Sequence, residues 1–566
     1  MRTDRVFLAL VGLLLAVISR VRADAAPPNV VLVMTDDQGY GDFGCHGNPI
    51  IQTPQVDALR AESVRLTDFH VDPSCAPTRS ALLTGKYSVR AGVWDTSSGR
   101  QILRRDEVTM GDVFRENGYR TAIFGKWHLG HNYPYLPEYR GFDESLVHYS
   151  GGVGQLPDHP GNDYYDDTYY RSGKPEKVKG YCGDVWFREG LRFIEENRTR
   201  PFFLYLSTNT PHGPYRVPEK YSKPYLDRGV PEQRAKFYGM CANIDENLGR
   251  LRQRLRELEL EDNTILIFMT DNGGTAGLQL SAKYHGFVTS GYNAGMRGAK
   301  QSMYEGGHRV PCFIHWPQGG IGGAASRNID VLTAHFDLLP TLIDLCGMKL
   351  TEKIQFDGIS LTKLLRGGAT ADWPERTLVA AVNRNQDPPK WYRVAILTER
   401  WRLVNGDELY DIVADPGQRK DVAAEHPDVI AHLKEWYEGY WKHVSKRFDE
   451  FARLVVGAPE ANPTMLCSHD LLEDSKQLAV DVVRTGRYEV TLSNDHPANQ
   501  RSLSAARAQL KIGDLDLRKN AAPDATTISF EARLEKGPTF VEAWFMGSAD
   551  DKPRRTPFYV FRYLGS

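Results

Sequence analysis

A chain of 566 residues is too long for one small domain, and at about 100–200 residues per domain it predicts roughly two to four. Hydrophobic residues make up 41% and charged residues 25%, which excludes disorder, collagen and coiled coil. The 70 Lys+Arg and 72 Asp+Glu leave a net charge of -2, which excludes a chain-wide basic field for nucleic acid or an anionic membrane. Seven cysteines are too sparse for a disulfide scaffold, and their odd number means that at least one does not pair within the chain.

The first 25 residues have the pattern of a secretory signal. Arg2 and Arg5 precede an apolar run at 6–18, and Ala23-Asp24-Ala25 forms a cleavage motif. The run is too short to span a bilayer comfortably, which favours cleavage over an uncleaved anchor. We therefore expect a signal peptide at 1–25 and a secreted or periplasmic protein (lysosomal or extracellular in a eukaryote), with no stable membrane insertion after cleavage.

Residues 28–375 alternate short apolar runs with helical stretches, as in an α/β domain. Strands are expected at 29–34, 119–124, 202–206 and 264–269, and helices at 55–63, 111–117, 185–197 and 237–258. The stretch 131–179 has little periodicity and predicts long loops on the rim of the domain. Its tyrosines from Tyr133 to Tyr170, with His148 and His159, either wall a sugar-binding pocket or pack as ordinary loop residues.

Two smaller units are predicted after the α/β domain. Residues 376–446 contain expected strands at 393–398, 400–405 and 408–411 and a helix at 423–441, which predicts an α+β subdomain. Residues 447–566 contain short alternating strands between Gly, Asn, Asp and Pro turns, a pattern typical of a β-sandwich. This last unit either binds polysaccharide or caps the α/β domain.

Polar side chains follow two strands of the α/β domain. Asp36 and Asp37 come after the run 29–34, and Asp271 and Asn272 after the run 264–269. Ligands of open α/β sheets gather at the carboxyl ends of strands. Three carboxylates and an amide oxygen there form an oxygen-only site that suits Ca²⁺ or Mg²⁺ and disfavours zinc. The alternative is that these residues are simply turn formers.

Basic side chains follow other strand ends. Lys126 and His128 come after the run 119–124, His212 follows the run 202–206, and Lys300 follows a Gly-rich loop. Singly, each is better explained as a surface or hydrogen-bonded residue. Together with an oxygen-rich metal site, they indicate a pocket for a doubly charged tetrahedral anion.

The sharpest local motif spans residues 75–86. Pro77 suits the first turn of a helix, which places Cys75 near its positive end and Arg79 one turn on, facing back. As a plain thiol, Cys75 is a candidate nucleophile or half of a disulfide. The pairing of the six other cysteines is left open: Cys45, Cys182, Cys241, Cys312, Cys346 and Cys467.

The pattern Cys75-x-Pro77-x-Arg79, followed by Leu83-Thr84-Gly85, resembles the signature of type I (formylglycine-dependent) sulfatases, arylsulfatase-like in kind. Thr78 stands where that family usually has Ser and keeps the hydroxyl. The resemblance covers about 420 residues in family order, through Pro28-Asn29-Val30, Asp36-Asp37-Gln38-Gly39, Gly125-Lys126-Trp127-His128-Leu129-Gly130, Asn209-Thr210-Pro211-His212, Thr270-Asp271-Asn272-Gly273, Lys300 with Tyr304-Glu305-Gly306-Gly307, and Glu408-Leu409-Tyr410-Asp411 with Asp415-Pro416. The C-terminal β unit lies outside it.

This resemblance implies an alkaline-phosphatase-like α/β fold, in which helices flank a central mixed sheet. It implies that a formylglycine-generating maturation enzyme oxidises Cys75 to 3-oxoalanine (formylglycine). It also implies one Ca²⁺ per chain, with Mg²⁺ the less favoured ion. The implied ligands are Asp36, Asp37, Asp271, Asn272 and an oxygen of the modified Cys75.

The resemblance further implies how a sulfate monoester is cleaved. One hydroxyl of the hydrated aldehyde at residue 75 attacks sulfur and expels the alcohol, which leaves a sulfated enzyme. The other hydroxyl then loses its proton, sulfate leaves and the aldehyde returns. Arg79 and His128 would hold the diol, with His128 as the base for the second step.

Three further residues are implied to bind the substrate. Lys126, His212 and Lys300 would contact the sulfuryl oxygens, and His212 or Lys300 would protonate the departing alcohol. We therefore expect a secreted sulfuric ester hydrolase that acts on an aryl sulfate or a sulfated carbohydrate.

Two other functions compete with this expectation. One is a phosphomonoester or phosphonate monoester hydrolase of the same superfamily, although phosphatases of this fold usually carry extra His and Asp zinc ligands. The other is an inactive glycan-binding homologue. The presence of Cys75, Arg79, both lysines and both histidines argues against the second alternative.

Overall fold

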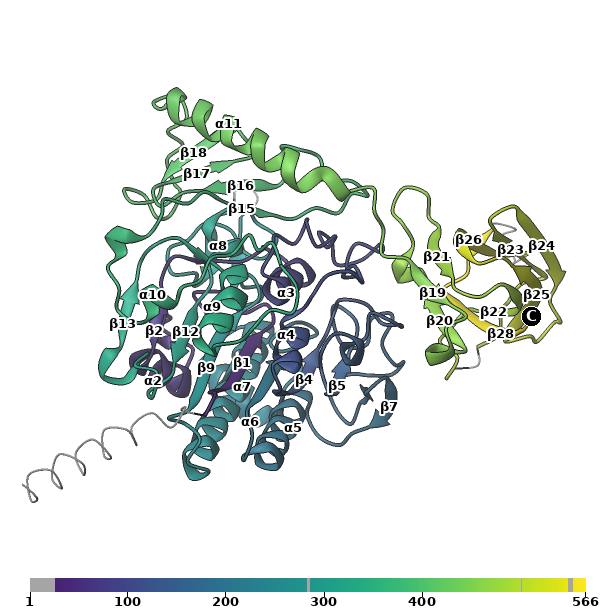
Figure 1. Cartoon of the computed structure of the whole chain (residues 1–566), viewed down its shortest axis with the longest axis horizontal. Coiled ribbons are helices and arrows are strands. Elements are labelled where there is room, and N and C mark those ends of the chain that lie inside the picture. Colours follow the sequence, from purple (N-terminus) through teal and green to yellow (C-terminus); the bar gives the residue numbers. More distant parts are fainter. Residues whose placement is uncertain (1–25, 282–285, 500, 548–552) are drawn as a thin grey trace, which may run out of the picture.

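The computed structural model describes residues 26–281, 286–499, 501–547 and 553–566, which form a large α/β unit and two smaller sheet-containing units (Figure 1). The expected signal peptide at 1–25 lies outside the described residues. Within the described part of the chain, no helix has the length and apolar character needed to cross a membrane.

The α/β unit is built on a ten-stranded mixed sheet with the order β13-β2-β12-β9-β1-β8-β4-β5-β6-β7. Its centre is parallel: β9 (Thr264–Thr270), β1 (Asn29–Thr35), β8 (Phe202–Ser207), β4 (Arg120–Lys126) and β5 (Glu144–His148). Every residue of β1 is buried, as expected for a strand covered on both faces. The flanking strands are β12 (Cys312–His315), β2 (Val64–Leu66), β13 (Arg327–Ile329), β6 (Thr168–Arg171) and β7 (Lys174–Lys177).

Helices cover both faces of this sheet. On one face, α2 (Pro54–Glu62), α5 (Cys182–Asn197) and α7 (Glu232–Glu257) share an apolar cluster with Val31 and Val33. On the other face, α3 (Cys75–Thr84), α4 (Met110–Glu116) and α9 (Leu338–Leu345) share a cluster with Val30, Leu32 and Met34. The division follows from the strand geometry, which points successive side chains to opposite faces.

The second unit is a four-stranded antiparallel sheet of β15 (Leu378–Ala381), β16 (Val394–Leu397), β17 (Trp401–Val404) and β18 (Glu408–Asp411). Helix α11 (Pro427–Val444) covers one face through Leu433 and Tyr437. The other face packs on the α/β unit, where Leu378 and Ala380 share an apolar cluster with Leu332.

The third unit, at the right of Figure 1, is a β-sandwich. One sheet contains β19 (Leu454–Val456), β21 (Leu478–Val482), β26 (Gly537–Met546), β23 (Arg507–Ile512), β24 (Leu515–Asn520) and β27 (Arg554–Arg555). The other contains β20 (Thr464–Cys467), β28 (Phe558–Gly565), β22 (Gly486–Ser493) and β25 (Thr527–Leu534). Val480 and Val541 of the first sheet share one apolar cluster with Val490 and Phe561 of the second. The predicted fold class is therefore confirmed, whereas the domain boundaries after residues 375 and 446 stay predictions.

The prediction of long loops over 131–179 was wrong in part, because this segment contains β5, β6 and β7. The sequence of β6 is Thr-Tyr-Tyr-Arg and that of β7 is Lys-Pro-Glu-Lys, and neither alternates apolar with polar residues. β7 is largely exposed at the edge of the sheet, so it needs no apolar face to be stable there.

Candidate active site

The strand register brings the predicted oxygen ligands together. The last residues of β1 and β9 are paired, so Asp36 and Asp271 leave the sheet side by side. The backbone N–H of Asp37 donates to Asp271 Oδ1 at 3.0 Å, and Asn272 Nδ2 donates to Asp37 Oδ1 at 2.9 Å. Asp37 has a φ of 67°, a left-handed conformation that non-glycine residues rarely adopt and that clusters at functional sites.

Each of the three buried carboxylates has a basic partner. The distances are 2.8 Å for Lys126 Nζ–Asp36 Oδ2, 2.6 Å for Lys300 Nζ–Asp37 Oδ1 and 2.8 Å for Arg79 Nη2–Asp271 Oδ2. Burial raises the pKa of Asp36 well above its usual value, against the opposing charge of Lys126. Although burial also raises the pKa of Asp37, Lys300 and His212 bring it below its usual value. When all three acids are ionised, the formal charges of these acids and bases cancel, so the cluster then has no surplus charge of its own.

Cys75 is the first residue of α3, a helix in which every residue is buried. Gly85 ends the helix with a φ of 66° and donates its N–H to the Ala81 carbonyl at 2.9 Å. The Cys75 Sγ and one carboxylate oxygen each of Asp36 and Asp271 lie within 4.8 Å of one another. The helix therefore directs its positive N-terminal end toward the carboxylate cluster.

Arg79 lies one turn into α3 and connects three strand ends. Its Nη1 donates to the Lys126 carbonyl at 3.3 Å and to Ser207 Oγ, and its Nη2 donates to Asp271. Gly125 is required beside this contact, because a Cβ there would lie 1.9 Å from the Ser207 carbonyl oxygen. Sequence reasoning missed Ser207, since one serine at the end of a buried strand carries no pattern of its own.

His128 is buried with a defined proton position. Its Nε2 lies 3.1 Å from the Thr96 carbonyl oxygen, which can only accept, so Nε2 carries the hydrogen. Its Nδ1 is buried without a hydrogen-bond partner. Burial and the Lys126 ammonium lower the pKa of His128 well below 6.5, so the ring is neutral and its Nδ1 lone pair can accept a proton. Thr96 contributes through its backbone, which sequence reasoning could not detect.

His212 faces the carboxylate cluster from the loop after β8. Its Nδ1 donates to the Gly213 carbonyl at 2.7 Å, and its Nε2 lies 3.6 Å from Asp37 Oδ2. Burial lowers the pKa of His212 to about 4, against the opposing charge of Asp37. The Tyr164 hydroxyl donates to the His212 carbonyl at 2.8 Å and supports this loop.

The loop that contains Gly151 and Gly152 closely approaches His128 and His212. A Cβ on Gly151 would lie 3.1 Å from His128 Cε1, and a Cβ on Gly152 would lie 3.1 Å from His212 Cε1. Gln155 belongs to the same loop and is exposed. Its amide therefore lies at the edge of the carboxylate cluster, a position that the sequence did not indicate.

The tyrosine-rich segment is mainly core, which favours ordinary packing over a sugar-binding wall. Tyr149, Tyr164 and Tyr169 are buried, and His148 is fully buried beside Asp158. His148 therefore cannot line an open pocket.

Two buried side-chain oxygens of the cluster are suited to bind a hard divalent cation. Asp36 Oδ1 and Asn272 Oδ1 are buried without a hydrogen-bond partner. Buried acceptors are rarely left unpaired, and carboxylate and amide oxygens are preferred ligands of Ca²⁺.

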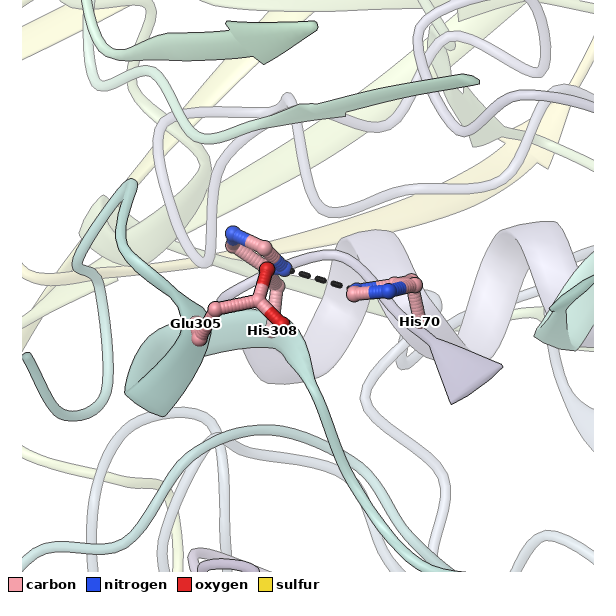
Figure 2. Close-up of side chains that lie close together, drawn as sticks. All are labelled: His70, Glu305 and His308. Carbon is pink, nitrogen blue, oxygen red and sulfur yellow. Dashed lines mark hydrogen bonds between the residues drawn. The ribbon is translucent and has the colours of Figure 1, made fainter. Parts of the chain in front are cut away.

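A second buried cluster contains His70, Glu305 and His308 (Figure 2). His70 Nδ1 and His308 Nδ1 share a hydrogen bond of 2.9 Å. Both carboxylate oxygens of Glu305 are occupied by arginines, since Arg402 Nε donates at 2.7 Å and Arg309 Nη1 at 3.2 Å. This network joins β17 to the α/β unit, and the two arginine cations beside Glu305 already balance its charge.

Known families match most of the chain. A family model described as "Sulfatase" matches residues 28–348, and one described as "N-sulphoglucosamine sulphohydrolase, C-terminal" matches residues 298–440. Human arylsulfatase A is 33% identical over 507 residues, which cover 84% of this chain and 93% of that protein. Human N-acetylgalactosamine-6-sulfatase is 31% identical over 369 residues, or 62% of this chain and 67% of that protein.

Solved structures share the fold. The crystal structure of Ps i-CgsB in complex with k-i-k-neocarrahexaose superposes with a TM-score of 0.65 and 26% identity, covering 75% of this chain and 95% of that one. The phosphonate monoester hydrolase of Agrobacterium radiobacter superposes with a TM-score of 0.54 and 22% identity, covering 74% and 96%. At that identity the second likeness shows the fold alone.

Proposed function

Because the chain belongs to the sulfatase family, we propose that it hydrolyses a sulfate monoester at the cluster around Cys75. One observation carries the proposal. Asp36, Asp37 and Asp271 converge at the N-terminus of the helix that begins with Cys75, where two ligand oxygens, Asp36 Oδ1 and Asn272 Oδ1, lack a hydrogen-bond partner. Since the acids and bases of the cluster cancel, a divalent cation would give it the positive surplus that holds an anionic ester.

Two groups would complete this site. Oxidised to formylglycine by a maturation enzyme and then hydrated, residue 75 would supply the oxygen nucleophile, in the place that the Cys75 thiol holds beside Asp36 and Asp271. A Ca²⁺ held by Asp36, Asp37, Asp271, Asn272 and residue 75 would supply positive charge to the sulfuryl oxygens. The unpartnered Asp36 Oδ1 and Asn272 Oδ1 support this ligand set over one that contains nitrogen or sulfur from the chain.

The cations of the chain have separate roles in this proposal. Lys126 and Lys300 bind sulfuryl oxygens, and Arg79 orients residue 75 from the same helix. Lys300 is the favoured proton donor to the departing alcohol, because its ammonium carries several N–H groups. His212 is less suited, because the single proton of its neutral ring lies on Nδ1 and is donated to the Gly213 carbonyl.

His128 is the proposed base for the second step, in which the proton leaves residue 75. The proton goes to Nδ1, the nitrogen that lacks a partner. Thr96 holds the ring in this orientation through Nε2.

This role predicts a specific pH dependence. Because burial and Lys126 lower the pKa of His128, its neutral form persists as the pH falls through 6.5, and protonation occurs only well below that value. We therefore expect kcat for an aryl sulfate, which includes the second step, to show no acidic limb near pH 6.5 when it is measured with saturating metal. A limb at that value, lost in His128→Gln, would contradict the assignment.

A sulfated carbohydrate is the proposed natural substrate. Two relatives support it: the name of N-acetylgalactosamine-6-sulfatase gives a sulfated sugar, and Ps i-CgsB was crystallised with k-i-k-neocarrahexaose. The N-terminal signal pattern supports export, which is the setting in which such substrates are met.

Paired initial rates on an aryl sulfate and the matching aryl phosphate test the reaction. We expect kcat/KM to favour the sulfate by on the order of a hundredfold, since the chain belongs to the sulfatase family. Equal or faster phosphate hydrolysis would support the phosphomonoester alternative. Mass analysis of the peptide that contains residue 75 completes the test, because an unmodified thiol in active enzyme would exclude the formylglycine chemistry.

A further inference from the structure

Three side chains of metal-ligand type meet where the α/β unit contacts the β-sandwich. His131 lies in the loop after β4, Cys467 ends β20, and Asp470 ends the short helix that follows. His131 Nε2 lies 3.3 Å from Asp470 Oδ2 and 3.9 Å from Cys467 Sγ, and Cys467 Sγ lies 4.0 Å from Asp470 Oδ2. The side chains of His131 and Asp470 are 3% and 1% exposed, and Cys467 is fully buried.

We propose that His131, Cys467 and Asp470 bind a zinc ion that joins the β-sandwich to the α/β unit. Tetrahedral zinc with ordinary bond lengths sets its nitrogen, oxygen and sulfur ligands about 3.3–3.6 Å apart. The three observed separations match this range or exceed it by a few tenths of an ångström. Binding removes the Cys467 thiol proton to solvent, which leaves thiolate, neutral imidazole and carboxylate as ligands.

The arrangement differs from that of a nucleophilic triad. In a Cys-His-Asp triad the carboxylate and the thiol occupy opposite nitrogens of the ring. Here both approach the same atom, His131 Nε2, so the three ligand atoms surround a common point. In the metal-free cluster, His131 Nε2 and the Cys467 thiol can each donate to Asp470 Oδ2, and a cation at the common point would replace both protons.

The groups next to these three residues also resemble the surroundings of a metal site. Gln101 Nε2 donates to the other carboxylate oxygen of Asp470 at 2.6 Å, as groups behind a metal ligand commonly do. His469 precedes Asp470, and its Nε2 is buried without a hydrogen-bond partner. The fourth position would be taken by water. In the cluster of Figure 2, by contrast, both oxygens of Glu305 accept from arginines.

The zinc site would fix the β-sandwich beside the loop that contains Thr96 and Ser98. The backbone N–H of Ser98 donates to the His469 carbonyl at 2.9 Å, two residues from the Thr96 carbonyl that orients His128. The mixed sulfur, nitrogen and oxygen donors suit zinc and not Ca²⁺, so the two metal sites of the protein would differ in chemistry.

Cobalt titration of the full-length protein tests the proposal without a variant. With excess Ca²⁺ present to fill the oxygen site, Co²⁺ added to metal-stripped protein is expected to bind at one equivalent with a thiolate-to-cobalt charge-transfer absorption. Zn²⁺ is expected to displace it. Wild-type protein that shows no such absorption would overturn the proposal.

Variants assign the signal to this cluster. Cys467→Ala and His131→Ala are each expected to lose the cobalt absorption and the bound zinc, while Cys346→Ala, a half-buried cysteine at the end of α9, retains both. Zn²⁺ is expected to raise the unfolding temperature of the wild type and of Cys346→Ala but not of Cys467→Ala. Equal zinc content and equal thermal shifts in all of these proteins would contradict the assignment, whatever the sulfatase activity.

Discussion

Replacing Cys75 with serine is expected to lower steady-state turnover of an aryl sulfate by about a thousandfold or more. Cys75 begins α3 with its Sγ beside Asp36 and Asp271, so a serine hydroxyl would lie in the same place. A serine can react once, but its carbon carries no second hydroxyl, so the resulting sulfate ester cannot collapse and release sulfate. The measurement is a progress curve at enzyme concentrations high enough to resolve the first turnover.

The control is Cys346→Ser, which changes a half-buried cysteine at the end of α9 and should retain turnover. Circular dichroism should show both variants folded, because serine is close in size to cysteine. Wild-type turnover by Cys75→Ser would rule out the proposed chemistry. An unchanged turnover rate after chemical reduction of the aldehyde at residue 75 to an alcohol would rule it out as well.

Replacing Asp271 with asparagine is expected to abolish binding of the proposed Ca²⁺ and to lower kcat/KM by about a hundredfold or more. The variant loses one of the negative charges that hold the cation, and it leaves the buried Arg79 guanidinium without its closest carboxylate. Breaking a buried ion pair in this way costs about 3–5 kcal/mol of folding stability. Metal content measured after dialysis, beside urea unfolding, separates the loss of metal from the loss of fold.

Asp42→Asn is the matched control. Asp42 is buried in the turn after Asp37, accepts the N–H of Gly39 at 2.9 Å, and has a pKa that burial raises to about 7. It is therefore already partly neutral at pH 7, and its replacement should leave metal content and activity near wild type. Retention of a full equivalent of Ca²⁺ in Asp271→Asn would remove Asp271 from the ligand set.

The local sequence pattern was sufficient to predict the central strands and helices of the fold. β1 and β9 are continuous apolar runs because both faces of the sheet are covered, and α5 and α7 carry the apolar positions that face it. Pattern failed for β5, β6 and β7, where pairing with the rest of the sheet decides the structure. It also left two interpretations of the tyrosine-rich segment, which burial then decided in favour of packing.

The sequence by itself supplied the residues of the proposed chemistry: the Cys75-x-Pro77-x-Arg79 motif, and acidic and basic residues that follow predicted strands. Only the tertiary structure decided which acid meets which base. Lys126 reaches Asp36 across 90 residues of chain, and Arg79 reaches Asp271 across 192. These contacts depend on strand order and register, which arise from packing between segments distant in sequence and leave no local pattern. For the same reason, the meeting of His131 with Cys467, 336 residues apart, could be found only in the folded chain.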